Sequence, residues 1–290
     1  MRRWVLAGLA VVGVVVAIIA ATTLVGRSGD RAAAAPPLSV TVEQYRTDEV
    51  ARTVKLAVRN TGDTTIEVVD AELVAPSFTP AGQVTTTALV PPGGLRVDIR
   101  SGYGRGRCTG PPDQLVSEPA SVRLGVRQPN QDIARVTLPL PYPNELLNRL
   151  LRLDCQQEAL LRIVTVAFGP LRPTADGALA GTLVLTRQSG AEPVTVHDVD
   201  GSVLISVDPE PADRPPPLGT LAGGAARLEM PVRVDAERCD GHALGEIKKP
   251  YVFPVWLRIG ATEQNTDVAV TEADKVTLFE MVRQRCHLAK

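Results

Sequence analysis

Aromatic residues are scarce in this 290-residue chain, where Phe, Tyr and Trp together make up 3%. The hydrophobic cores must therefore be built mainly from aliphatic side chains. An excess of one charge is also lacking, with 31 Lys and Arg against 32 Asp and Glu. A nucleic-acid-binding surface needs clustered basic residues, so this balance argues against DNA or RNA as a partner. With 22% charged and 44% apolar residues, the composition is that of a globular protein.

Signatures of catalysis are lacking as well. The chain has no Gly-x-Ser-x-Gly, no His-Glu-x-x-His and no protein-kinase set. The glycine-rich stretch 102–106 is not followed by Gly-Lys-Ser/Thr, which a phosphate-binding loop requires. We therefore expect no enzymatic activity and no cofactor.

The N-terminal segment predicts the compartment. The 22 residues from Trp4 to Val25 carry no charge. A helix of this length spans about 33 Å, enough for a hydrocarbon layer of about 30 Å. Arg2 and Arg3 precede it, and positive residues stay on the cytoplasmic side. We expect a single-pass plasma-membrane protein with a cytoplasmic N-terminus (1–3), a transmembrane helix (4–25), a linker (26–37) and an extracytoplasmic remainder.

A cleaved signal peptide is the alternative for this segment. The apolar region of such a peptide is about 7–15 residues, shorter than the run found here. The small residues Ala32 to Ala34 offer a cleavage site, but it lies well beyond the apolar run. In either case the part from Leu38 onward holds 27 basic and 31 acidic residues, so its formal charge is -4.

The four cysteines indicate two disulfide bonds. Cys155 follows Cys108 by 47 residues, and Cys286 follows Cys239 by the same 47. An even number of cysteines at a repeated spacing outside the membrane is typical of disulfides. Four cysteines allow three pairings, and the repeated spacing favours Cys108 with Cys155 and Cys239 with Cys286.

The same offset recurs in other residues and indicates a tandem duplication. Segment 121–127 matches 252–258 at an offset of 131, and Asn60-Thr-Gly62 matches Gln188-Ser-Gly190 at 128. Small changes of offset are expected from loop insertions. We predict two copies of one domain, at 38–158 and 159–290.

Each copy reads as an all-β domain with one short helix. Short stretches of alternating polarity, separated by Gly and Pro turns, are typical of an antiparallel β-sandwich. The stretches are 54–59, 66–74, 84–90, 95–100, 121–127 and 133–138 in the first copy, and 179–187, 194–207, 226–234, 251–259 and 266–270 in the second. Asn144 is placed to cap a helix over 145–154, and Thr271 with Asp274 is placed to cap one over 276–284.

The turn Val58-Arg-Asn-Thr-Gly62 resembles the strand-turn signature of bacterial cell-surface immunoglobulin-like β-sandwich modules. The resemblance covers about ten residues and implies an extracytoplasmic β-sandwich, without implying a ligand. Only five of the basic residues are Lys, which is typical of a GC-rich, actinobacteria-like genome.

Two sets of residues are candidates for a site. His242 lies three residues after Cys239, and His287 follows Cys286, so two Cys and two His could form a zinc or copper site. The first copy has the Cys pair without the His, and this favours the disulfide and no metal.

The other candidate is an apolar face formed by Val252, Pro254 and Trp256. Their alternation with Phe253, Val255 and Leu257 places them on the outward side of a strand. The matching residues of the first copy are Ser121, Arg123 and Gly125. A partner contact is one interpretation, because Trp is enriched at interface centres. A seam between domains, or cover by the helix, is the other.

These observations lead to one expectation and one alternative. We expect a membrane-anchored extracytoplasmic protein that works by contact with an envelope partner, as a scaffold or accessory subunit. The alternative is an extracytoplasmic binder of a small ligand or metal.

Overall fold

The computed structural model describes residues 37–212, 215–246 and 248–288. The predicted transmembrane helix at 4–25 lies outside the described residues, as does the linker at 26–37 except for Pro37. Within the described ranges, no helix combines the length and the apolar character that a membrane crossing requires.

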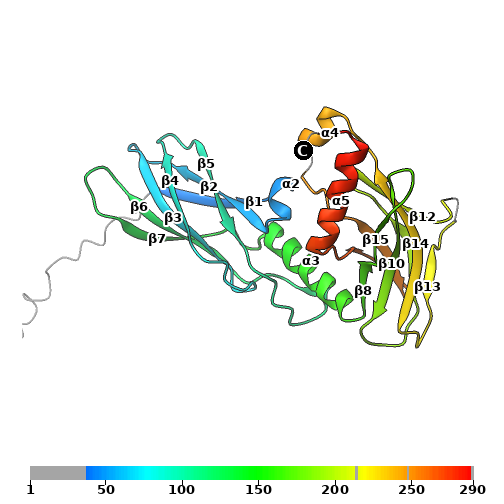
Figure 1. The fold of residues 1–290 in the computed structure, drawn as a ribbon. Helices are drawn as coiled ribbons and strands as arrows, with labels where there is room; N and C mark the ends of the chain where they lie inside the picture. The colour runs from blue at the N-terminus through cyan, green and yellow to red at the C-terminus, as the bar shows by residue number, and fades with distance from the viewer. Residues whose placement is uncertain (1–36, 213–214, 247, 289–290) are drawn as a thin grey trace, which may run out of the picture. The chain divides into compact units, whose positions relative to one another are not determined.

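The first β region, residues 38–161, holds two antiparallel sheets (Figure 1). One sheet has the order β1-β2-β5 and the other has the order β4-β3-β6-β7. The strands are β1 (Leu38–Glu43), β2 (Thr53–Asn60), β3 (Ile66–Val74), β4 (Val84–Val90), β5 (Arg96–Gly102), β6 (Ser121–Arg127) and β7 (Ala134–Pro139). The helical elements are α2 (Arg46–Glu49), η1 (Pro112–Gln114) and α3 (Glu145–Leu161).

The second β region, residues 164–285, also holds two antiparallel sheets. Their orders are β12-β14-β10-β8, with β9 paired to β10, and β13-β11-β15-β16. The strands are β8 (Val164–Phe168), β9 (Arg172–Pro173), β10 (Leu179–Arg187), β11 (Val194–Val199), β12 (Ile205–Pro209), β13 (Gly219–Leu221), β14 (Arg227–Ala236), β15 (Pro254–Ile259) and β16 (Thr262–Asp267). The helices are α4 (Gly241–Glu246) and α5 (Glu272–Arg285).

Aliphatic side chains fill the core of each region, as the low aromatic content predicted. In the first, Leu56, Ile66 and Leu124 are fully buried within one cluster. In the second, Leu183 and Leu257 belong to a separate cluster. Each such side chain contributes roughly 1.5–3 kcal/mol through burial. Among the described residues, the few buried aromatic ones are Phe78 and Tyr103 in the first cluster and Phe253 in the second. The structure is mostly β and sandwich-like, so the predicted fold class is confirmed at that level.

The two regions share a strand plan. Order β4-β3-β6-β7 in the first corresponds to β13-β11-β15-β16 in the second, and β1-β2-β5 corresponds to β8-β10-β14. Strand β12 is an addition at the edge of the second. Both central strands carry a β-bulge, between Val68 and Asp70 in β3 and between Val196 and Asp198 in β11. These bulges are 128 residues apart, the offset already seen at Asn60 and Gln188.

The predicted capping residues are confirmed, although α5 begins at Glu272, four residues before the expected start at 276. The Asn144 side chain accepts a hydrogen bond from the Leu147 backbone N at 3.1 Å. Thr271 and Asp274 form a capping box at the start of α5. The first helix is longer than expected, since α3 continues to Leu161, and the expected domain boundary after residue 158 falls inside it.

The expectation of one short helix per copy is wrong. The first region also has α2 and η1, and the second also has α4. Helices of three to six residues are too short to show a helical hydrophobic period, which is why the sequence pattern missed them. For α4, the signal is a local one, because the Asp240 side chain accepts a hydrogen bond from the Ala243 backbone N at 3.0 Å.

Both predicted disulfides are present. Cys108 is bonded to Cys155 and Cys239 to Cys286. Cys155 lies on α3 and Cys286 caps the end of α5. Each bond therefore ties a helix to the chain that follows a sheet strand, β5 in one case and β14 in the other.

Candidate functional site

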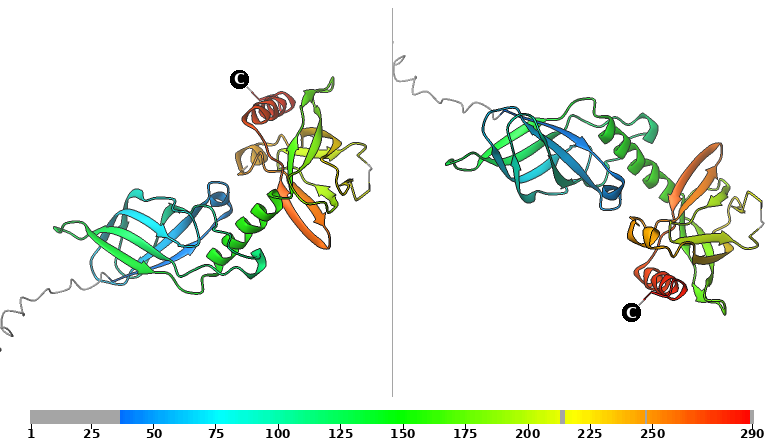
Figure 2. Two further views of the ribbon diagram at one scale, coloured as in Figure 1. Left: turned by 90° about the horizontal axis from the view of Figure 1, so that it is seen from below. Right: turned by 90° about the horizontal axis from the view of Figure 1, so that it is seen from above.

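The predicted contact residues lie at the start and the middle of β15. Trp256 is 36% exposed, while the alternating residues Phe253, Val255 and Leu257 are completely buried. Pro254 begins the strand, and Val252 precedes it. The β15–β16 hairpin and α5 lie on opposite sides of the second region in both views of Figure 2, so this helix does not cover the hairpin.

Trp256 lines a surface hollow of about 300 Å³. The other lining residues come from β11, the turn after it, and the β15–β16 hairpin: His197, Asp198, Asp200, Leu257 and Glu263. Val252 and Pro254 are not among them. The structure thus keeps Trp256 as the centre of the candidate site and replaces its predicted apolar neighbours with polar and acidic ones.

The bulge in β11 places two polar side chains at this hollow. Val196 pairs with Leu257 and Asp198 pairs with Trp256, which leaves His197 as the extra residue. A bulge changes the direction of side chains locally, and bulges are enriched next to functional sites. Within the described part of the chain, the buried Nε2 of His197 has no hydrogen-bond partner.

The acidic side chains of the hollow differ in their partners. Glu263 accepts a hydrogen bond from Arg258 at 2.5 Å, and this bond holds the pKa of Glu263 below its usual value. The Asp198 carboxylate accepts a hydrogen bond from the Val199 backbone N at 2.9 Å. Asp200 is held near β15 by its backbone N, which donates to the Pro254 carbonyl at 2.8 Å. Among the described residues, no cationic side chain pairs with Asp198 or Asp200.

In the first region, the residues equivalent to Asp198, Trp256 and Asn265 contact one another. Asp70 pairs with Gly125, and its carboxylate accepts hydrogen bonds from the Gly125 backbone N at 3.1 Å and from the Arg135 guanidinium. A Cβ on Gly125 would lie 2.4 Å from Asp70 Oδ2. Glycine is therefore required for the aspartate to fold over the strand.

Two residues differ at the equivalent positions of the second region, where these contacts are absent. Trp256 occupies the position of Gly125, opposite the bulge aspartate in both cases. Asn265 occupies the position of Arg135, because each pairs with the Gly or Trp of the neighbouring strand. Asp198 is exposed, its carboxylate accepts a hydrogen bond from the Val199 backbone N, and the residue opposite Trp256 on β16 is Asn265 in place of an arginine. An exposed carboxylate beside an indole ring results.

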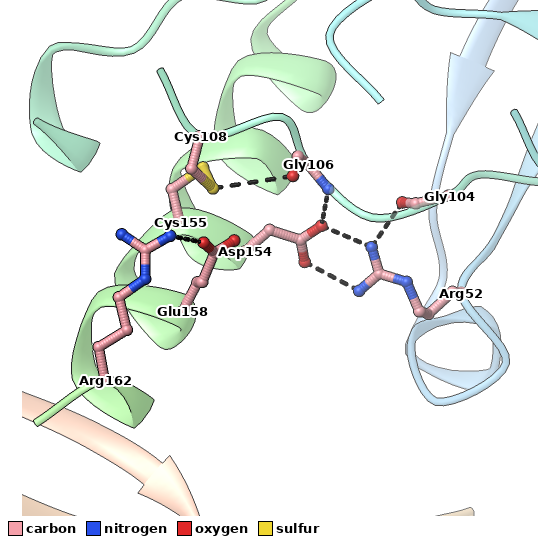
Figure 3. The surroundings of a disulfide bond; sticks show 8 residues. All are labelled: Arg52, Gly104, Gly106, Cys108, Asp154, Cys155, Glu158 and Arg162. Carbon is pink, nitrogen blue, oxygen red and sulfur yellow. Dashed lines mark hydrogen bonds and ion pairs between the residues drawn. A yellow bond between two sulfur atoms is a disulfide. The ribbon is translucent and has the colours of Figure 1, made fainter. Parts of the chain in front are cut away.

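A second polar cluster lies beside the disulfide of the first region (Figure 3). The Arg52 guanidinium donates to both oxygens of Asp154, at 2.8 and 2.6 Å, and to the Gly104 carbonyl at 2.7 Å. The Gly106 backbone N donates to the same carboxylate at 2.7 Å. The guanidinium also lies 4.6 Å from the centre of the Tyr103 ring.

This cluster works as a structural clamp. The hydrogen bond to Asp154 raises the pKa of Arg52, which stays charged. Since both carboxylate oxygens of Asp154 are occupied, the cluster joins α3 to the start of β2 and to the segment after β5. It leaves no oxygen of Asp154 available for chemistry.

The cysteines proposed as ligands in the metal alternative are not available to bind a metal ion. The sulfur atoms of Cys239 and Cys286 are bonded to each other and are not thiolates. His242 lies on α4 and His287 follows the end of α5. In the part of the chain that the structure describes, no three His, Cys, Asp or Glu side chains are grouped so that they could hold a metal.

Sequence reasoning missed the acidic part of the hollow. The expected stretch 194–207 contains both Asp198 and Asp200, but the sequence analysis did not recognise them as parts of a site. One signal was available: the offset of 128 aligns Asp198 with Asp70, and the offset of 131 aligns Trp256 with Gly125. The first alignment shows an aspartate in both copies, and the second shows a glycine where the second copy has Trp256.

Comparisons with known proteins give no close relative. No family model and no curated protein matches the chain. Among solved structures, the CsuC–CsuE chaperone–tip adhesion subunit complex of Acinetobacter baumannii is 11% identical, over 76% of this chain and 93% of that one, with a TM-score of 0.21.

Two enzymes are similarly distant. Red sea bream transglutaminase is 12% identical over 81% of this chain and 31% of that one (TM-score 0.20). The exo-chitosanase CsxA of Amycolatopsis orientalis is 17% identical over 80% and 26% (TM-score 0.18). At these scores the similarities carry no argument about function.

Proposed function

We propose that this chain is a membrane-anchored, extracytoplasmic interaction protein without catalytic activity. Residues 4–25 anchor it, and two tandem immunoglobulin-like domains face away from the cytoplasm. It acts as a scaffold or accessory subunit that contacts an envelope partner through the sheet of β11, β15 and β16. The paired cysteines support this compartment, because disulfides form and persist in oxidising environments.

One observation carries the proposal. Trp256 is held at the surface in a hollow, at a position where the first region has a glycine and a closed ion pair. An exposed Trp flanked by polar groups is typical of an interface centre. The opposite face of the same strand supplies the core, so Trp256 is not needed to complete it.

Photo-crosslinking in intact cells tests the proposal. A photoreactive amino acid replaces Asn265, which is exposed and pairs directly with Trp256. The matched control replaces exposed Asp208 on β12, in the other sheet. We expect a discrete crosslinked product from position 265 only. Trp256→Ala should weaken this product, while the protein is still expressed at the same level and still unfolds cooperatively.

Equal products from both positions, or a product insensitive to Trp256→Ala, would contradict the proposal. The small-ligand alternative predicts a different result: no crosslinked protein at either position. The metal form of that alternative predicts stoichiometric zinc or copper that His242→Ala removes.

A further inference from the structure

We infer that the hollow around Trp256 binds the arginine side chain of a basic segment in a partner protein. This inference rests on the proposed function and names the chemistry by which the same surface recognises its partner. The argument starts from the first region, which holds such a side chain within its own fold.

In the first region, the bulge aspartate binds a guanidinium. Asp70 and Arg135 form an ion pair across β6, with the Asp70 side chain 10% exposed. Arg135 extends from β7, an edge strand of its sheet, so its guanidinium reaches the aspartate from the side. This ion pair shows that an aspartate after the bulge can bind a guanidinium that lies over the neighbouring strand, here β6.

The second region keeps the aspartate and lacks the cation. Asp198 has the same bulge position as Asp70, while Asn265 stands where Arg135 would be. Asp200 adds a second carboxylate without a cationic partner among the described residues. A guanidinium supplied from outside would restore the pairing that the first region makes internally.

Trp256 makes the hollow selective for a planar cation. A guanidinium stacks on an indole face and at the same time donates two hydrogen bonds to a carboxylate. The indole and the Asp198 carboxylate belong to directly paired residues, so one guanidinium can contact both. Glu263 is already bonded to Arg258, which leaves Asp198 and Asp200 as the acceptors.

The charge of the surroundings favours a basic partner. The part of the chain from Leu38 onward has 31 acidic and 27 basic residues, and three acidic residues line this hollow. Opposite charges across an interface raise the association rate and exclude wrong partners. A protein segment that carries arginine fits these features better than an uncharged saccharide, which would leave the carboxylates without a counter-charge.

Direct binding by the full-length chain in detergent micelles tests the inference. The sequence has two Trp residues, so Trp4→Phe leaves Trp256 as the only indole fluorophore. The probe is a Gly-Gly-Arg-Arg-Gly-Gly peptide. The same peptide with citrulline, the uncharged analogue, is the matched control, and a trimer of N-acetylglucosamine tests a saccharide.

We expect a saturable change of Trp256 fluorescence with the arginine peptide and at least about tenfold weaker binding of the citrulline peptide. Asp198→Asn should weaken arginine binding by about tenfold, while Asp208→Asn on β12 should not change it. The double variant Trp256→Gly with Asn265→Arg recreates the residues of the first region. It should bind no arginine peptide, as shown by calorimetry, and should still unfold cooperatively.

Equal binding of the citrulline peptide, tighter binding of the saccharide, or no binding of any probe would overturn the inference. The crosslinking experiment keeps the two proposals separate. A Trp256-dependent crosslink in cells without arginine binding leaves the proposed function standing and removes this recognition chemistry. Absence of the crosslink removes the proposed function itself.

Discussion

The two β regions share one strand plan, and each has an aspartate after the bulge of the corresponding strand. The side chain of this aspartate has different partners in the two regions. In the first region, Asp70 is bonded to Gly125 and Arg135 and the surface is closed. In the second, Asp198 faces Trp256 and the surface is open. Within one strand plan, the two regions therefore differ at Gly125 against Trp256 and at Arg135 against Asn265.

A charge reversal occurs beside each disulfide. The residue before the second cysteine of each region is Asp154 in α3 and Arg285 in α5. Asp154 is bonded to Arg52, whereas Arg285 is bonded to Asp235. The charges are exchanged, and the partners lie at different places, Arg52 in the turn before β2 and Asp235 on β14. Each region thus keeps an ion pair at the residue before its second cysteine, whereas at the bulge aspartate only the first region has one.

Removal of the disulfides should give the largest effects and test whether the two regions are equally dependent on them. The loops have the same separation of 47 residues. The chain-entropy model assigns each bond about 4 kcal/mol. Cys155 is 2% exposed and belongs to the core, so Cys108→Ala with Cys155→Ala should cost more than Cys239→Ala with Cys286→Ala.

Hydrogen exchange measures the two regions separately, through the amides of β2 in one and β10 in the other. We expect faster exchange only in the region whose bond is removed. If both double variants accelerated exchange equally in β2 and β10, the two regions would unfold as one unit and the comparison would fail.

The contrast between Gly125 and Trp256 predicts the next largest effect. Alanine normally stabilises a strand relative to glycine, because it loses less conformational entropy on folding. At Gly125 the sign should reverse, since the added Cβ would displace the Asp70 carboxylate from its hydrogen bonds. We expect Gly125→Ala to lower the free energy of unfolding by about 2 kcal/mol, and Trp256→Ala to lower it by less than about 1 kcal/mol.

Urea unfolding of the full chain measures both changes. Asp70→Asn, combined with Gly125→Ala, is the control, because the two substitutions should be less than additive if they act through the same contact. A Gly125→Ala variant as stable as the parent would show that Asp70 has room to move and that the glycine is not required.

The sequence predicted the parts of this architecture that repeat. The two cysteine spacings predicted both bonds, and polar alternation predicted strands such as β3, β4, β6 and β10 with the bounds observed. The sequence analysis did not predict β8 and β13, because they are too short to show a clear alternation. It also did not predict β1, which directly follows the linker. Segment 194–207 was read as one extended stretch, whereas the turn at 200–204 divides it into β11 and β12.

The candidate site was only partly predictable, for a physical reason. Outward parity in a strand placed Trp256 on the surface, and that depends on local alternation alone. The neighbours of Trp256 depend on the register between β11, β15 and β16, and on the bulge at His197. A one-residue change of register moves every side chain to the other face, so the acidic residues required the three-dimensional pairing.

The smallest expected difference concerns low pH. It involves the hydrogen bonds of Asp176 with Thr174 and Arg233, which belong to the second region. The Thr174 hydroxyl, and then the Arg233 guanidinium, hold the pKa of Asp176 well below its usual value. A carboxyl group whose pKa is lowered by folding stabilises the protein above its unfolded pKa and loses this contribution as the pH falls. Arg233→Gln should therefore lower the urea midpoint at about pH 6 and have less effect at about pH 2.5.

The fluorescence of Trp256 in the Trp4→Phe chain reports this transition from within the second region. Arg135→Gln is the matched variant in the first region, where the guanidinium binds Asp70 instead. It should leave the Trp256 transition unchanged at both pH values. Arg233 also pairs with Asp235. A pH-independent effect of Arg233→Gln would therefore contradict the prediction, since the contribution of either carboxylate must decrease as the pH falls.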